Sequence, residues 1–199
     1  MKSSFWQRHP QLIDIISVII FVVSVVIGTV LINTFVFQSY TVVGQSMEET
    51  LHNGERIIVN RLPITWSRLQ NNDYTPERGD IIVFENPNYT AGMKDQYIVK
   101  RVIAFSGERV KVEDGVLTVY NDEYPNGFKP DDGFNDKPKD YTSHDGKWAV
   151  PDKEIFVAGD TREGNNSLDS RSGLGTVPLY NIDGPGKIRH FPFEKIRTF

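Results

Sequence analysis

Residues 15–37, IISVIIFVVSVVIGTVLINTFVF, form an uninterrupted apolar stretch, and the rest of the chain is organised around it. No charged residue occurs between Asp14 and Glu48. Because about 20 helical residues cross the hydrocarbon core of a bilayer, the stretch predicts a transmembrane helix, which we place at residues 12–34. A cleaved secretory signal would have a shorter apolar core followed by small residues, whereas bulky residues follow here. The sequence therefore favours a retained anchor.

The charges beside this stretch predict its orientation. Lys2 and Arg8 lie before it, in a short tail of residues 1–11, and no positive charge follows it for some distance. By the positive-inside rule, the amino terminus should lie in the cytoplasm. We then expect a single-pass protein of the cell membrane, with residues 35–199 as an extracytoplasmic domain.

The domain after the anchor is predicted to be mainly antiparallel β structure. Aromatic and β-branched residues, which favour strands, are concentrated in segments 35–43, 56–60, 80–84, 96–105, 154–158 and 187–191. Asp114-Gly115 lies between two alternating runs and predicts a type I′ hairpin turn. Residues 62–69 are a weak helix candidate. Residues 121–147, rich in Pro, Gly, Asp and Asn, indicate a loop-rich surface excursion rather than a second domain.

The composition argues against several kinds of function. The chain has no cysteine, which excludes a catalytic thiol, a thiolate metal site and disulfides. Its histidines lack the spacing of metal ligands, so we expect neither a metal nor a cofactor. The net charge of −4 argues against a nucleic acid as partner.

Two polar residues are candidates for chemistry. Ser46 lies in a loop just beyond the apolar stretch, and Lys100 lies in an apolar strand segment. The residues that would share the lysine's face of that strand are Ile98, Val102 and Ala104. A lysine buried on such a face has a lowered pKa, and the neutral amine can act as general base on a serine hydroxyl. The ordinary alternatives are a turn serine and an edge-strand lysine that limits aggregation.

A third polar stretch, residues 158–173, follows the last-but-one expected strand. It is dense in hydrogen-bonding side chains. It could be a polar loop held by Asx turns and a surface ion pair between Asp169 and Arg171, which alone would contribute little. It could also be a set of side chains that positions a catalytic base. The residues alone leave both interpretations open.

Together these stretches resemble the bacterial type I signal peptidases. Short motifs follow the anchor in the family's order: Ser46-Met47 with Thr50-Leu51, residues 78–84, residues 100–104 with Gly107-Glu108, and Gly159-Asp160 with Arg162 and residues 166–171. A single motif of this length would be weak evidence, but four of them in order after an anchor are highly specific.

The resemblance implies a membrane-anchored serine endopeptidase that removes signal peptides from secreted preproteins after small residues, in an A-x-A-like pattern. It implies Ser46 as nucleophile, Lys100 as general base and an oxyanion hole that includes the Ser46 backbone amide. Its partners would be the preproteins and the lipid bilayer, and we expect a monomer in the membrane. Gly44 stands where some relatives carry a hydroxyl, so no side-chain donor is expected there.

The resemblance also implies supporting roles in the last motif. Ser167 would hydrogen-bond the lysine amine, while Asp169 and Arg171 would brace the site. Asp160 belongs to the same motif and is counted with these supporting residues.

The chain departs from the family's pattern at three places. Glu49 stands where proline is usual, Thr161 stands where asparagine is usual, and Glu163-Gly164 resembles an insertion. We expect these departures to affect rate and substrate range more than the type of reaction, because Ser46 and Lys100 are both present.

Two other functions were weighed against this one. Self-cleaving repressors share the Ser–Lys chemistry, but they are soluble and carry a DNA-binding module, whereas this chain has an anchor and no basic module. The other alternative is a catalytically idle or weak anchored β domain that binds a partner, supported only by Glu49 and the altered last motif.

Overall fold

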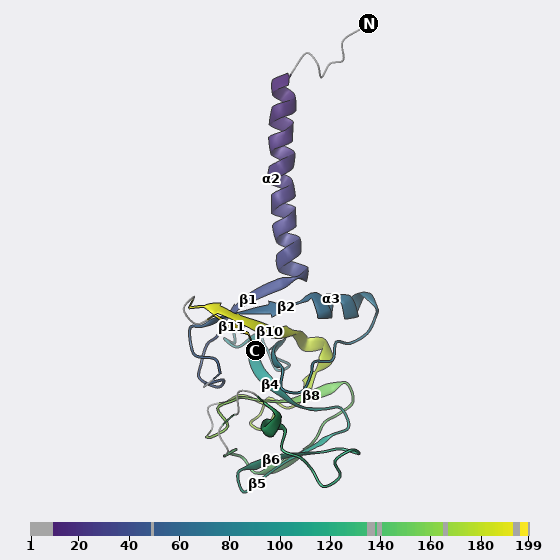
Figure 1. Ribbon diagram of the computed structural model, residues 1–199, viewed down its shortest axis with the longest axis vertical. Helices are drawn as coiled ribbons and strands as arrows, with labels where there is room; N and C mark the ends of the chain where they lie inside the picture. Colours follow the sequence, from purple (N-terminus) through teal and green to yellow (C-terminus); the bar gives the residue numbers. More distant parts are fainter. Residues whose placement is uncertain are drawn as a thin grey trace.

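The computed structural model describes residues 10–48, 50–134, 138, 141–164, 167–192 and 196–198. One long helix, α2 (Pro10–Phe35), projects from one end of a β domain (Figure 1). Its apolar residues are exposed, and none of its 18-residue apolar window is buried against the domain. A helix of this length and composition can span a bilayer. The predicted anchor, residues 12–34, lies inside it, while residues 1–9 of the predicted tail lie outside the described residues.

The domain is built from two antiparallel sheets. The larger has the order β1-β2-β10-β3-β4-β8-β9, with β11 also paired to β10. Its strands are β1 (Phe37–Thr41), β2 (Arg56–Asn60), β3 (Ile81–Glu85), β4 (Tyr97–Phe105), β8 (Glu154–Ala158), β9 (Val177–Pro178), β10 (Ile182–Phe191) and β11 (Arg197–Thr198). The smaller has the order β6-β5-β7, formed by β5 (Arg109–Glu113), β6 (Val116–Tyr120) and β7 (Gly146–Ala149). The predicted fold class is confirmed.

Several local predictions are also confirmed. β2 and β8 have the predicted bounds, 56–60 and 154–158. Asp114 and Gly115 join β5 to β6 with φ of 52° and 78°, the positive values that a type I′ turn requires. The helix candidate forms α3 (Leu62–Leu69), and the described residues also include two short 3-10 helices, η1 (Pro130–Gly133) and η2 (Leu179–Asn181).

The two-residue strands β9 and β11 were not predicted, and β7 and β10 also differ from the sequence prediction. β7 was not predicted and begins at Gly146, within the polar segment 121–147. β10 begins at Ile182 rather than 187, because Gly184-Pro185-Gly186 continues the strand instead of turning. A Cβ at Gly184 would lie 2.6 Å from the carbonyl oxygen of Asn60, so glycine lets β10 pass close to β2 as it changes partner from β3.

β4 lies between two hydrophobic cores. Its residues do not all lie on the faces that the sequence predicted. Ile98 and Val102 pack into one cluster with residues of β3 and β8. Ile103 and Ala104 pack into a second cluster between the two sheets. The pairing of β4 with β8 skips Ile103, so an extra residue in β4 shifts the register there. Ala104 therefore does not share the face of Lys100, as the strict alternation of a strand had predicted.

The junction between α2 and the domain is short and hydrogen-bonded. β1 begins at Phe37, directly after the helix. The Arg61 backbone N–H donates to the Val36 carbonyl at 2.8 Å, and the Thr65 hydroxyl donates to the Phe35 carbonyl at 2.9 Å. The start of α3 is thus bonded directly to the end of α2.

Candidate active site

The loop that carries Ser46 joins β1 to β2 and is fixed by apolar side chains. Met47 is 1% exposed, and Leu51 is fully buried beside it in a third hydrophobic cluster. The Leu51 backbone N–H donates to the Met47 carbonyl at 2.7 Å, which closes the turn after the serine. Because its neighbour is anchored in the core, Ser46 is held at the surface of the domain in a defined position.

Lys100, in β4, is the residue that faces this serine. Its side chain is buried, with 3% of the residue exposed, and its Nζ lies 2.5 Å from Ser46 Oγ. Burial lowers the pKa of Lys100 from 10.5 to about 8, although Asp169 and Asp160 oppose that shift. The structure thus brings together the two residues predicted to carry the chemistry.

Asp169 collects several hydrogen bonds behind this pair. It accepts bonds from the Ser167 hydroxyl at 2.6 Å, from the Gly159 backbone N–H at 2.9 Å and from Arg171 Nη2 at 2.6 Å. Burial would raise the pKa of Asp169, but these donors, with Arg171 first, lower it below its usual value. Asp169 is therefore a fixed negative charge near the lysine. The Asp169–Arg171 pair is buried, not the surface pair of the alternative interpretation.

Ser167 has a different bond from the one that the resemblance implies. Its hydroxyl donates to Asp169, and a hydroxyl has a single proton to donate. Toward the amine of Lys100, the Ser167 oxygen could therefore act only as an acceptor. In that arrangement an N–H of the neutral amine would point to Ser167, and the nitrogen lone pair would remain for Ser46.

Gly159 lets these groups approach one another. A Cβ at this position would lie 2.3 Å from Ser167 Oγ and 2.4 Å from the carbonyl oxygen of Ser46. Real side chains do not approach so closely, so only glycine fits between the nucleophile loop and Ser167.

We expect Gly159→Ala to lower kcat by about a hundredfold, because displacing reacting groups by about 1 Å has an effect of that size. Turnover of a peptide substrate is the measurement, with the thermal midpoint recorded on the same samples. Gly133→Ala is a suitable control, because a Cβ there meets nothing within 4 Å. Near-normal turnover of Gly159→Ala would show that the close packing at Gly159 is not needed for the reaction.

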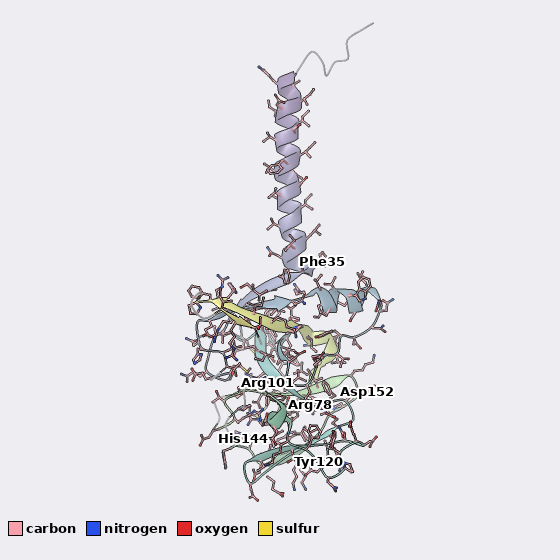
Figure 2. All side chains as sticks on the ribbon, viewed as in Figure 1. Phe35, Arg78, Arg101, Tyr120, His144 and Asp152 are labelled. Carbon is pink, nitrogen blue, oxygen red and sulfur yellow. The ribbon has the colours of Figure 1, made fainter. Side chains whose placement is uncertain are left out.

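Asp160 lies on the other side of β4 in a second buried cluster. Its carboxylate accepts bonds from Arg101 at 2.7 and 2.6 Å and from the Thr50 hydroxyl at 2.6 Å. Arg101 also donates to the Gly79 carbonyl at 2.9 Å, and it lies inside the domain (Figure 2). Arg101 and Thr50 belong to the matched motifs, but no role could be assigned to them from the motifs alone. Here their hydrogen bonds to Gly79 and Asp160 connect all four motifs.

Thr161, noted as a departure from the family's pattern, fastens the nucleophile loop. Its hydroxyl lies 2.5 Å from the Gln45 carbonyl and 3.1 Å from the Glu48 carbonyl, and its backbone N–H donates to the Ser46 carbonyl at 3.1 Å. Sequence reasoning missed this role, because a threonine in a polar loop carries no signal for a contact so distant along the chain. Glu49, another departure, lies outside the described residues.

The segment of the apparent insertion is bonded to the 121–147 region. Arg162 is fully buried and makes paired bonds of 2.6 Å to both carboxylate oxygens of Asp131 in η1. The Gly164 backbone N–H donates to the Ser143 hydroxyl at 2.8 Å. The described part of 121–147 therefore supports the polar loop after β8 from outside.

The backbone near Ser46 could stabilise an oxyanion. Gly44 has φ of 96°, a value that favours glycine, and its N–H donates to Asn53 Oδ1 at 3.0 Å. The Ser46 N–H donates no hydrogen bond within the described part of the chain. That N–H therefore remains for a ligand. In the same part of the chain, no group of three His, Asp or Glu side chains is placed to hold a metal ion.

A groove of about 710 Å³ runs past the two candidate residues. Ser46 and Lys100 lie on its lining, between the segment that leaves β1 and the start of β4. Residues 97–100 of β4 pair with β3, but the pairing with β8 begins only at Arg101. Among the described residues, one backbone edge of residues 97–100 thus has no partner strand, and an extended peptide in the groove could pair with it.

Comparison with known proteins adds an independent finding. The family model described as signal peptidase, peptidase S26, matches residues 12–191. A signal peptidase I of Bacillus amyloliquefaciens is 35% identical over 178 residues, which cover 88% of this chain and 88% of that relative. Signal peptidase I S of Bacillus subtilis is 35% identical over 210 residues, covering 99% and 98%. The crystal structure of a signal peptidase I from Enterococcus faecalis is 28% identical, with a TM-score of 0.41, covering 56% of this chain and 96% of that one.

Proposed function

Because this chain belongs to the signal peptidase family, peptidase S26, and is a serine endopeptidase that cleaves signal peptides from secreted preproteins, we propose that Ser46 is its nucleophile and Lys100 its general base. The observation that supports this assignment most is the 2.5 Å separation of Ser46 Oγ from a buried Lys100 Nζ whose pKa is lowered to about 8. A neutral amine at that distance can take the hydroxyl proton without a histidine.

The proposed reaction has two stages. Lys100 Nζ accepts the proton of Ser46 Oγ as the oxygen attacks the scissile carbonyl, and the backbone N–H of Ser46 stabilises the negative oxygen that forms. The protonated lysine then gives its proton to the leaving amine, and the peptide bond breaks to leave an acyl ester on Ser46. In the second stage Lys100 deprotonates a water that hydrolyses this ester, and the proton returns to Ser46 Oγ.

The remaining site residues would position this pair. Asp169, held by Arg171, fixes the Ser167 hydroxyl, and Gly159 lets that hydroxyl lie against the nucleophile loop. Asp160 and Arg101 would brace β4 next to the lysine. Each acts through Ser46 or Lys100 rather than on the substrate.

For the substrate we propose cleavage after small residues in an A-x-A-like pattern. The groove beside Ser46 is lined in part by aliphatic side chains, among them Ile57, Val83 and Ile98, which would suit small apolar groups. Both members of the proposed dyad come from one chain, which supports action as a monomer.

A cleavage assay tests the proposed function together with its pH dependence. Incubation of the detergent-solubilised protein with a preprotein should yield a new amino terminus after a small residue, identified by sequencing. Because the neutral amine is the active form, kcat/KM should rise with pH through about 8, the lowered pKa of Lys100, and then level off. A flat profile through this range would contradict Lys100 as the base, whereas absence of cleavage at every pH would contradict the function itself.

We also propose that the amino terminus lies in the cytoplasm and the β domain outside, as the charges before α2 suggest. Protease added to intact cells without their wall should then digest the domain beyond Tyr40. If the domain were completely protected in intact cells and digested only after lysis, the orientation would be the opposite of the one proposed.

A further inference from the structure

The smaller sheet, which lies at the end of the domain away from α2, presents a basic face (Figure 1). The alternate residues of β5 that point inward are buried in the core, so Arg109 and Lys111 lie on the opposite face. Lys147 of β7 lies directly opposite Lys111 in register and shares that face. Lys111 pairs with Glu113, whereas Arg109 and Lys147 form no ion pair with a carboxylate of the described residues. A chain of net charge −4 thus carries two uncompensated cations on one sheet face.

A groove of about 450 Å³ accompanies these cations. Arg109, Lys111 and Lys147 all lie on its lining, together with the aromatic side chains Tyr120 and Trp148. The guanidinium of Arg109 lies 5.8 Å from the centre of the Tyr120 ring, which is opposite it in register. The volume is within the range of sites that hold organic ligands, so the cations border a groove rather than a flat surface.

The edge of β7 indicates which kind of ligand fits this groove. β7 is the last strand in the order β6-β5-β7, and its other edge has no partner strand among the described residues. An extended peptide can add to such an edge as a further strand. Its side chain opposite Lys147 would lie on the basic face, as would the side chains two residues to either side. Ala149 is small, so the next of these side chains could reach Arg109 across it. Charge and geometry together therefore favour an extended chain with acidic residues at alternate positions.

We propose that this face is a second binding site for the preprotein, at which an acidic, extended segment of the mature part adds to β7 as a strand. The proposal rests on the function proposed above, because the mature part lies on the side of the membrane where the β domain cleaves it. The chain itself limits the distance to the cleavage site. Nine residues separate Lys100 from Arg109, so at most roughly 30 Å lies between them. A segment about 20 residues after the scissile bond could thus reach β7 while that bond lies at Ser46. Binding at both places would raise the effective concentration of the scissile bond at Ser46.

Binding of a labelled peptide to full-length Ser46→Ala in detergent tests the site without catalysis. A short peptide of alternating Glu and Thr should bind at low ionic strength, as measured by fluorescence anisotropy, whereas its Gln–Thr counterpart should not. Arg109→Gln/Lys147→Gln should weaken the binding by about tenfold, since two ion pairs are lost. Lys153→Gln/Arg68→Gln, which removes two exposed cations outside the groove, is the matched control and should leave the affinity unchanged. Equal binding of the two peptides, or full affinity of Arg109→Gln/Lys147→Gln, would overturn the proposal.

Methylation of the peptide tests the addition of a strand. Alternate N–H groups of a strand point to opposite edges, and only one of the two sets can donate to β7. One peptide is therefore N-methylated at its Glu amides and another at its Thr amides. We expect one of them to lose binding and the other to keep it. If both bound equally, the face would attract any polyanion, and the proposed strand pairing would be wrong.

A cleavage assay tests whether the mature part is the ligand. Two preproteins are compared that differ only in a segment about 20 residues after the scissile bond, Glu–Thr in one and Gln–Thr in the other. KM should be several-fold lower for the acidic preprotein with kcat unchanged, and Arg109→Gln/Lys147→Gln should remove the difference. Equal KM values, or a difference that persists in the variant, would overturn the proposal. Absence of cleavage of both preproteins would instead contradict the proposed function, and the peptide binding would not depend on it.

Discussion

Ser46→Ala is expected to abolish preprotein cleavage, with a loss in kcat on the order of 10⁶, while the protein remains folded. The alanine retains the backbone N–H but has no oxygen to form the acyl ester, so neither stage of the reaction can proceed through it. Met47 and Leu51 hold the loop from the core, so the thermal midpoint should hardly change.

The measurement is single-turnover cleavage of a preprotein, with the thermal midpoint recorded on the same samples. Ser39→Ala is the matched control, because Ser39 is an exposed serine of β1 and does not line the groove. If Ser46→Ala kept more than a trace of activity while Ser39→Ala behaved normally, another residue would have to be the nucleophile.

Lys100→Met is the second prediction, and it separates catalysis from stability. Methionine keeps much of the apolar stem and lacks the amine, so cleavage should fall to the level of Ser46→Ala. Lys100→Arg should be inactive as well, because a guanidinium does not give up its proton.

The stability of Lys100→Met should change in the opposite direction. The pKa of Lys100 is lowered from 10.5 to about 8 by burial, so the unfolded chain binds the proton more readily than the folded one. Below about pH 8 this difference lowers the free energy of unfolding by about 3 kcal/mol, and the loss disappears as pH rises from about 8 toward 10.5. At neutral pH, Lys100→Met should therefore be as stable as the unaltered protein or more stable. A variant that unfolds well below the unaltered protein, or that cleaves normally, would return Lys100 to a structural role.

Local patterns predicted the elements of this fold better than their connections. The apolar run before Gln38 predicted α2, and the Asp114-Gly115 turn predicted its hairpin, because both signals lie within a few residues. β7 was missed because it begins within a polar, turn-rich segment. Its four residues form a strand through their pairing with β5, which the local sequence does not indicate. The early start of β10 was missed because Gly184-Pro185 is a turn signal unless two neighbouring strands hold it extended.

In the site, too, local features could be predicted from the sequence, whereas contacts between distant segments could not. Burial of Lys100 followed from its apolar neighbours, but its contact with Ser46 was available only through the resemblance of the motifs to a family. Contacts between distant segments, such as Thr161 with Gln45 or Arg162 with Asp131, cannot be predicted from the sequence of either segment alone. They arise because the loop after β8 is packed against the loop after β1 on one side and against η1 on the other, an arrangement that only the whole fold creates.

The backbone edge of residues 97–100 in β4, which has no partner strand among the described residues, bears on the range of substrates that one enzyme can cleave. A peptide held along a strand edge is bound through its amide groups, and every polypeptide has the same amides at the same spacing. The affinity of such binding does not depend on most of the substrate's side chains. Only the few side chains that enter the groove beside the scissile bond can be selected. A preprotein that paired with this edge would be bound through the backbone of β4, and one peptidase could then process unrelated exported proteins without a separate site for each.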